Sequence, residues 1–536
     1  MLTHLFAGLT KWAQTENGEL EIEPDLATEI PEPVTNEDGT VTYTYVLRDG
    51  LKWSDGKDLT ANDFVFSWKR AGNAGTGNDY YYLFQNVKGF SMDEPDAPLA
   101  IEAVDDKTFK VTLSNYIAYW NQLVAFPVFF PVREDVVANE AWATDPSTYV
   151  SNGPYTMTDW KHNSAVTVQK NAAYHDAAKV TMDSIVFCLS DDANNMVSNF
   201  ENGSWQFIEE IPTNEMTSLS EKYPDEFKVS PQLSVMFNCW TVGTKLLPED
   251  SKLTGDEAEL AQADIRKAFM LLFDREHIVT DITQAGETAA ATFVPVGMKE
   301  PSGAEFCAGS GRGAGKGYYD IAPESMQDNY AKAVETLKKY YKFDEGTQTF
   351  TNVPSFTFLY TKNETYKAIG EYMQGVYSQL GITMELENQE RNDYLVTYSA
   401  GAYQTAFGRW IADYADPVTF LDMWITTSGN NSACFGRDEH AKAKIYDLDL
   451  TDLGYELKVQ KGTWAETYDA LIALIGTEAD ENKRVALMHK AEDLLMSTGA
   501  ICPLYFGSDA YMLSKNVQGF YSSPLGYRFF SQTVFV

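Results

Sequence analysis

Apolar and polar residues alternate early in the chain, as they do in half-buried strands. From Val41 to Leu47, every second position holds Val, Tyr, Tyr or Leu, with Thr and Val between them, and this period of two predicts a strand. Asn17-Gly18 and Asp38-Gly39 are favoured in tight hairpin turns. Residues 104–113 predict a strand pair that bends at Asp105-Asp106. The chain is therefore expected to open with strands and hairpins.

A helix is expected after these hairpins. Thr60 and Asp63 have the spacing of a capping box, and they predict a helix over residues 61–70. Asn152-Gly153-Pro154 then breaks the chain. Residues 166–169 and 184–189 have the composition of strands.

The second half of the chain alternates helices with strands. The pattern predicts an αβαβ order of helix 330–341, strand 356–360, helix 364–380 and strand 382–386. A helix within residues 256–279 comes before this region, and a helix over 481–497 comes after it. Such alternation is typical of α/β lobes. No internal repeat or linker-like composition separates the lobes, so we expect them to be interleaved in sequence.

Size and charge narrow the class of protein. The chain has 536 residues, 44% of them apolar, which is too many for one core and predicts two or more lobes. Its formal net charge of −36 excludes nucleic acid as a partner, because binding phosphates requires a basic face. The acidity favours solubility and cationic ligands. The 13% of aromatic residues suits either a binding cleft or a large core.

The cysteines give no sign of a metal site. None of the five forms a CxxC pair, and the odd number leaves at least one without an intrachain partner. We predict neither a metal nor another cofactor. The five are Cys188, Cys239, Cys307, Cys434 and Cys502.

The first residues lack the features of a secretory leader. Residues 1–9 contain neither a basic segment nor a cleavage site. The longest apolar run, 123–132, is interrupted by Pro127 and is too short to span a bilayer. Either the protein is cytosolic or its leader lies outside this sequence. We expect the second, because the first residues have the pattern of the middle of a fold.

Catalytic motifs are sparse. The six histidines never occur at HxxxH spacing, and no GxSxG motif is present. Residues 308–317 are glycine-rich, but Gly317 follows Lys316 where a phosphate loop has Ser or Thr, so they predict a surface loop. We therefore expect no enzyme. A secreted hydrolase that uses an acidic pair remains open among the 77 carboxylates.

Residues 43–70 read YTYVLRDGLKWSDGKDLTANDFVFSWKR. This closely resembles the signature of the family of oligopeptide-, dipeptide- and nickel-binding proteins of ABC importers, known as extracellular solute-binding protein family 5. Four further segments resemble that family in the right order: LFAGL at 5–9, SNGPY at 151–155, IRKA at 265–268 and WIADYADP at 410–417. The resemblance covers nearly the whole chain and is nearest to the oligopeptide-binding members.

The resemblance implies an α/β, two-lobed periplasmic-binding-protein-like fold of type II, in its large form with an extra subdomain and a ligand cleft between the lobes. The first lobe would take residues 1–20, 155–262 and 504–536. The extra subdomain would take 21–154, and the second lobe 263–503. Closure about a hinge is the expected motion.

The resemblance also implies a peptide site. Asp413 would bind the α-ammonium group of the peptide, since a charge-assisted hydrogen bond is strong and directional. Strand-like pairing would hold the peptide main chain. Trp410 and Tyr82 would supply aromatic faces, and amides would bond to the peptide backbone. The pairing segments would be Thr10-Lys11-Trp12 and Gly408 to Ala412, and the amides Asn430 and Asn431.

Each site residue also has a purely structural interpretation. Asp413 could cap a turn, Trp410 could belong to the core, and Tyr82 could be plain β surface. The two asparagines could simply form a loop. Some positions also depart from the family.

Where relatives place basic residues near the peptide carboxylate, this chain has Phe407, with Arg409 close by. Arg391 stands where an aromatic residue is common, and Tyr366 where a histidine occurs. These departures leave the preferred peptide length open.

The sequence thus predicts the substrate-binding protein of an ABC importer that captures short peptides. Its partners would be those peptides and the permease subunits. It would act as a monomer outside the cytoplasm, periplasmic or as a cell-surface lipoprotein whose lipid anchor lies outside this sequence. The alternative is a receptor of the same fold for another solute, such as an oligosaccharide or a metal chelate.

Overall fold

The chain divides into two compact units. Our computed structural model describes residues 1–15, 20–91, 94, 96–437, 448–455 and 462–536. Unit 1 comprises Met1–Ser230 and Asp509–Val536, and unit 2 comprises Pro231–Ser508. The chain leaves unit 1 within strand β11 (Phe227–Trp240) and returns to it within β18 (Ile501–Leu513). Unit 2 is therefore one continuous insertion into unit 1.

This division differs in part from the predicted lobes. Residues 231–262 lie in unit 2, although the sequence prediction gave them to the first lobe. The reason is that β11 continues past Ser230 and pairs through residues 234–240 with a strand of unit 2. Residues 504–508 lie in unit 2 as well. The proposed subdomain, 21–154, lies within unit 1 and stays a prediction.

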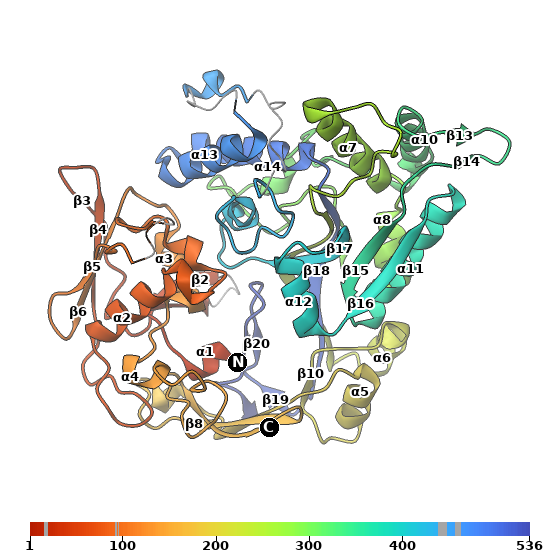
Figure 1. Ribbon diagram of the computed structural model, residues 1–536. Helices are drawn as coiled ribbons and strands as arrows, with labels where there is room; N and C mark the ends of the chain where they lie inside the picture. Colours follow the sequence, from red (N-terminus) through yellow and green to blue (C-terminus); the bar gives the residue numbers. More distant parts are fainter. Residues whose placement is uncertain (16–19, 92–93, 95, 438–447, 456–461) are drawn as a thin grey trace. The chain divides into compact units, whose positions relative to one another are not determined.

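A four-stranded sheet occupies one part of unit 1. Its order is β3 (Val34–Thr35), β4 (Val41–Val46), β6 (Thr108–Leu113) and β5 (Ile101–Ala103). Helix α2 (Ala61–Ala71) covers one face (Figure 1) and buries Phe64 and Trp68. The Thr60–Asp63 capping box is present. The predicted strand 41–47 and helix 61–70 are thus confirmed, and the predicted strand pair begins at Ile101 rather than at Val104.

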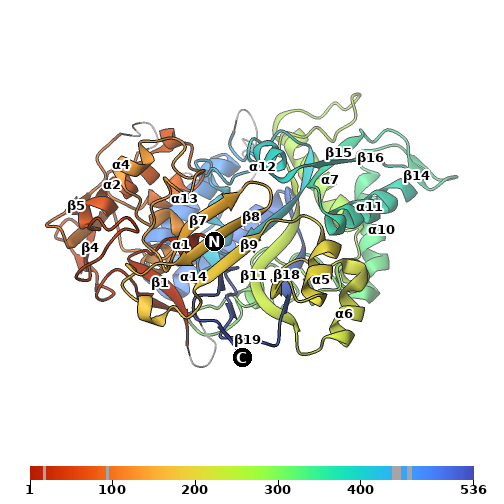
Figure 2. The same ribbon diagram turned by 90° about the horizontal axis from the view of Figure 1, so that it is seen from below.

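The Asn-Gly-Pro turn holds the start of the chain in place. The Asn152 side chain accepts the Ala7 N–H at 3.1 Å and donates to the Ala7 carbonyl at 3.0 Å, as a paired strand would. A Cβ on Gly153 would lie 2.6 Å from the Leu5 carbonyl carbon, so only glycine fits there. The turn leads into an antiparallel sheet, which Figure 2 shows: β7 (Tyr155–Lys161), β8 (Ala165–Lys170) and β9 (Ser184–Cys188).

The other elements of unit 1 are short. Strands β1 (Thr10–Gln14) and β2 (Leu20–Pro24) pair antiparallel, while the predicted Asn17-Gly18 turn between them lies outside the described residues. The helices are α1 (Leu2–Leu5), α3 (Trp120–Leu123), α4 (Glu134–Val137), α5 (Ala193–Glu201) and α6 (Met216–Lys222). The remaining strands are β10 (Phe207–Ile208), β19 (Val517–Gln518), β20 (Tyr521–Ser522), β21 (Arg528–Phe529) and β22 (Val534–Phe535).

A mixed sheet organises unit 2. Its strands follow the order β18, β11, β17 (Thr405–Ile411), β15 (Phe356–Thr361) and β16 (Met384–Gln389), and β12 (Thr288–Ala289) pairs with β18. Strand β15 is parallel to both β16 and β17, whereas β11 and β17 are antiparallel. Helix α11 (Glu364–Gln379) lies along β15 and β16 (Figure 1). This arrangement confirms the predicted αβαβ order.

Helices make up much of the rest of unit 2. They are α7 (Gly255–Met270), α8 (Arg275–His277), α9 (Phe306–Gly309), α10 (Met326–Leu337), α12 (Arg391–Ser399), α13 (Trp464–Thr477) and α14 (Glu481–Ser497), beside the hairpin β13 (Phe343–Asp344) and β14 (Thr349–Phe350). The prediction placed α10 four residues late and β16 two residues early. Among the described helices, none is both long and apolar enough to cross a membrane.

Candidate functional site

Strand β17 carries the first part of the predicted site. It pairs with β11 so that Val235 lies opposite Trp410 and Phe237 opposite Gly408. Successive side chains of a strand point to opposite faces, so Gly408 and Trp410 share one face. A Cβ on Gly408 would lie 2.4 Å from the Phe237 ring and 2.7 Å from the Tyr398 hydroxyl. Packing therefore demands glycine at position 408, whatever its backbone binds.

One edge of β17 lacks a neighbouring strand beyond Ala406. On that edge β15 pairs only with Thr405 and Ala406, and within the described residues β11 is the only strand that pairs with residues 407–411. The Ala412 N–H points toward β11, where it donates to the Leu233 carbonyl at 2.8 Å. Because backbone groups alternate in direction along an antiparallel strand, those of Arg409 and Ile411 point to the other edge. The Phe407 carbonyl points the same way and accepts a hydrogen bond from the Tyr394 hydroxyl.

Asp413 follows directly after this strand. It is only 7% exposed, and its backbone N–H donates to the hydroxyl of Thr419 at 3.2 Å. The indole N–H of Trp410, a side chain 9% exposed, donates to the carbonyl of the same Thr419 at 2.9 Å. The chain thus turns back after Asp413, so that Thr419 contacts both Asp413 and Trp410.

Two acidic residues, one half-buried and one buried, hold this turn. Asp416 accepts the Val418 N–H and forms a two-pronged ion pair with Arg484 of α14, at 2.7 and 2.8 Å. Asp422 accepts a hydrogen bond from the Tyr414 hydroxyl at 2.7 Å. Burial raises the pKa of Asp422 to about 7, because a charged carboxylate is poorly solvated in the interior.

The two neighbouring asparagines differ in their partners. The Asn431 side chain binds the backbone of Phe435 twice, accepting its N–H at 3.0 Å and donating to its carbonyl at 2.8 Å. Its amide therefore stabilises its own loop. The buried Nδ2 of Asn430 has no hydrogen-bond partner among the described residues. Of the two, only Asn430 has a side-chain nitrogen without any partner among the described residues.

The predicted residues of unit 1 lie on β1 and in a short 3₁₀ turn. Thr10 donates to the Asn121 carbonyl at 3.3 Å, and the Lys11 ammonium lies 3.8 Å from the Asp25 carboxylate. The indole N–H of Trp12 is buried and has no partner among the described residues. Tyr82 is fully buried, so its ring belongs to the aromatic core of unit 1. This burial leaves no exposed aromatic face at Tyr82.

Two of the positions that depart from the family come together. The rings of Tyr366 and Phe407 stack with centroids 4.2 Å apart. Phe407 is buried, and it lies on the face of β17 opposite to Gly408 and Trp410. Arg409 lies on the face of Phe407, where its exposed side chain donates to Gln232 at 3.0 Å. Arg391 opens α12 and is exposed.

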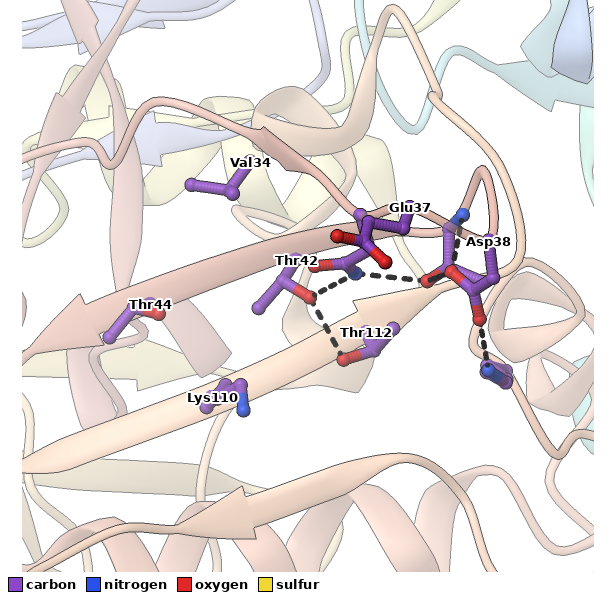
Figure 3. A pocket seen from close by; sticks show the side chains of 10 residues that line it. Val34, Glu37, Asp38, Thr42, Thr44, Lys110 and Thr112 are labelled. Carbon is purple, nitrogen blue, oxygen red and sulfur yellow. Dashed lines mark hydrogen bonds and ion pairs between the residues drawn. The ribbon is translucent and has the colours of Figure 1, made fainter.

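An open polar hollow of about 630 Å³ lies elsewhere, on the outer face of the four-stranded sheet of unit 1. Figure 3 shows Thr42 and Thr112 side by side on its floor, with their hydroxyl oxygens 3.1 Å apart. Asp38 at its rim pairs with Lys88 at 3.0 Å. None of the predicted site residues lines it. Since its polar groups bind one another, we interpret it as a solvated sheet face.

Sequence reasoning missed several residues that shape the site. Asp416 had one signal, the Asp-Pro pair that often opens a helical turn. Thr419, Arg484 and Tyr394 had none, because each acts through a partner that only the fold brings close. Within the described residues, no group of three or more His, Cys, Asp or Glu side chains could hold a metal ion.

The architecture, two α/β units joined through strands β11 and β18, is that of the periplasmic-binding-protein-like receptors, in the type II form. Residues 21–432 match the sequence family described as bacterial extracellular solute-binding proteins, family 5, middle. The chain belongs to this family. The predicted family and fold class are thereby confirmed.

Named relatives match over most of their length. The oligopeptide-binding protein OppA of Bacillus subtilis is 28% identical, covering 100% of this chain and 88% of its own. The dipeptide-binding protein DppE of the same organism is 28% identical, covering 93% of this chain and 82% of its own. The crystal structure of the substrate-binding domain of an oligopeptide ABC transporter from Bacillus anthracis aligns with a TM-score of 0.78 at 26% identity, covering 100% of this chain and 93% of that one.

Proposed function

We propose that this protein captures short peptides outside the cytoplasm and delivers them to the permease of an ABC importer, without converting them chemically. Membership of a solute-binding family supports capture. The relatives named for oligopeptides and dipeptides support peptides as the solute. The similar structure described as the substrate-binding domain of an oligopeptide ABC transporter supports the permease as a partner.

The observation that carries the proposal is the open edge of β17. Peptides share a backbone and differ in side chains, so a receptor for many of them must bind the main chain. The backbone N–H and C=O groups of Arg409 and Ile411 point to an edge that β15 leaves unpaired. An extended peptide can add there as a further strand.

Asp413 is the proposed partner of the peptide α-ammonium group. It stands two residues beyond Ile411, just past the open edge. Asp413 as a whole is only 7% exposed. A carboxylate in such a buried residue gains more from a cation than an exposed one does, because water screens the pair less. A peptide lying along β17 would bring its amino terminus to this end of the strand.

A receptor of the same fold for an oligosaccharide is the weaker candidate. Exposed aromatic faces would favour it, but Tyr82 is fully buried and Trp410 is only 9% exposed. The open backbone edge favours peptides, since sugars do not pair with strands.

Thermal unfolding in the presence of peptides tests the proposal. The protein is first stripped of bound ligand by unfolding and refolding. Its midpoint is then measured with a pool of three- to six-residue peptides, and again with the same pool N-acetylated. A ligand that binds only the folded state raises the midpoint. We expect a shift with the free-amine pool, little shift with the acetylated pool, and loss of the difference in Asp413→Asn.

A matched control is Asp452→Asn, which removes an exposed carboxylate of unit 2 and leaves the difference in place. Equal shifts with both pools would keep peptides as ligands and refute the role of Asp413. No shift with either pool, combined with a shift on adding oligosaccharides, would refute the peptide proposal.

A further inference from the structure

Thr419 contacts two of the predicted ligand residues of unit 2, Asp413 and Trp410, through different atoms. Its hydroxyl oxygen accepts the Asp413 N–H at 3.2 Å, and its carbonyl accepts the Trp410 indole N–H at 2.9 Å. Thr419 is fully buried. A buried hydrogen bond orders its donor more firmly than an exposed one, because no water competes for it.

Thr419 is itself held from several sides. It belongs to the 3₁₀ turn η8 (Pro417–Phe420), whose first turn Asp416 caps through the Val418 N–H. The Thr419 N–H donates to the Asp416 carbonyl at 3.1 Å. The Asp416 carboxylate is in turn fixed by both terminal nitrogens of Arg484. A chain of bonded groups thus runs from α14 through η8 to the backbone of Asp413.

The backbone at Asp413 lies just beyond the strand pairing that orders residues 405–411. Strand pairing ends with Ile411, and the last backbone bond to β11 is that of the Ala412 N–H to Leu233. The next backbone donor, that of Asp413, goes to the Thr419 hydroxyl instead. This hydrogen bond ties the backbone that carries the Asp413 carboxylate to the turn after it.

We propose that Thr419 is a positioning residue for peptide recognition: its hydroxyl sets the orientation of Asp413, and hence the preference for peptides with a free amino terminus. The inference rests on the proposed function, since it assumes that Asp413 binds the α-ammonium group. Thr419 does not touch the peptide. Its effect is on the discrimination between free and blocked amino termini more than on affinity for the peptide backbone.

The test compares two substitutions at the same position. Thr419→Val keeps the shape and the carbonyl that holds Trp410 but loses the hydroxyl. Thr419→Ser keeps the hydroxyl. For each stripped protein, titration of the midpoint with the free-amine and the N-acetylated peptide pools gives the ratio of their apparent dissociation constants. We expect Thr419→Val to reduce that ratio by about tenfold, the effect of one buried hydrogen bond, and Thr419→Ser to restore most of it.

Thr405→Val is the matched control. Thr405 is equally buried and lies on the same strand as Trp410, but its hydroxyl donates to Asn238, at 2.8 Å. This variant should lower the midpoint without ligand and leave the ratio unchanged. The same loss of discrimination in Thr405→Val, or an undiminished ratio in Thr419→Val, would overturn the inference while the proposed function stands. If the wild-type protein binds the free-amine and the N-acetylated pools equally well, the role of Asp413 is refuted, and the inference with it.

Discussion

Arg484 donates to Asp416 through both terminal guanidinium nitrogens, at 2.7 and 2.8 Å. The two side chains are only 7% and 13% exposed. The pair joins α14 to the turn that carries Thr419. Removing one member of a buried pair leaves the other charge without compensation, which typically costs about 3–5 kcal/mol. The ion pair is therefore a structural requirement of this turn.

Arg484→Met is expected to destabilise unit 2. The free energy of unfolding should fall by about 3 kcal/mol or more, since Asp416 would remain buried without its cation. Urea denaturation followed by circular dichroism measures the loss. In the control, Lys342→Met removes an exposed pair with Asp250, which should cost less than about 1 kcal/mol. Equal losses in the two variants would contradict this account of the buried pair.

Gly153→Ala is expected to disrupt the turn that holds the start of the chain. A Cβ there would lie 2.6 Å from backbone atoms of Leu5 and Phe6, which cannot give way as a side chain would. By contrast, Gly375 lies exposed within α11 with nothing near its Cβ position. Gly375→Ala should therefore stabilise the helix by about 0.5–1 kcal/mol. Thermal midpoints that move in the same direction for both variants would refute this.

Stability should depend on pH through Glu492. This residue is fully buried, accepts the N–H groups of Phe293 and Val294 and the hydroxyl of Ser310, and has its pKa raised by burial to about 7. Because the folded-state pKa lies above the unfolded value, the carboxyl contributes stability below about pH 4.5, and this contribution is lost as the pH rises through 7.

Glu492→Gln removes this ionisation and should gain stability relative to the wild type between pH 5 and 8. The difference between their thermal midpoints across that range measures the effect. The control, Glu481→Gln, changes an exposed residue in the first turn of the same helix and should show no such trend. A difference between Glu492→Gln and the wild type that stays constant with pH would contradict the proposed ionisation.

Thiol labelling should separate the cysteines by burial. Cys188 is exposed, whereas Cys239 and Cys502 are fully buried, and burial raises the pKa of the Cys239 thiol to about 12. Iodoacetamide should therefore modify Cys188 in the native protein and the two buried thiols only in denaturant. Mass spectrometry of the digested protein identifies the modified residues. Native labelling of Cys239 at the rate of Cys188 would contradict the packing described.

Local chemistry predicted much of the fold. Helix α14 begins and ends at the predicted residues, because Asp480 caps its N terminus and the apolar spacing runs without a break. Helix α12 was missed, since Leu395 and Val396 are exposed on it and obscure the helical pattern. The boundary between the units at Ser230 lies within a continuous strand, where local sequence carries no signal.

The site was predictable only in part. Family resemblance singled out Asp413 and Trp410, but no spacing rule connects either of them to Thr419, because the contact depends on how the chain turns after Pro417. Asn430 and Asn431 are chemically identical in sequence. Only the position of Phe435 shows that one amide is committed to its own loop while the other is not.

The order in which the units fold follows from the insertion of unit 2. Unit 2 is one uninterrupted segment, Pro231–Ser508, whereas unit 1 is built from Met1–Ser230 and Asp509–Val536. To complete unit 1, the chain must bring strands β19 to β22 back across the whole insertion, and closing a longer loop costs more entropy. We therefore expect unit 2 to fold first on refolding and unit 1 to be completed after it.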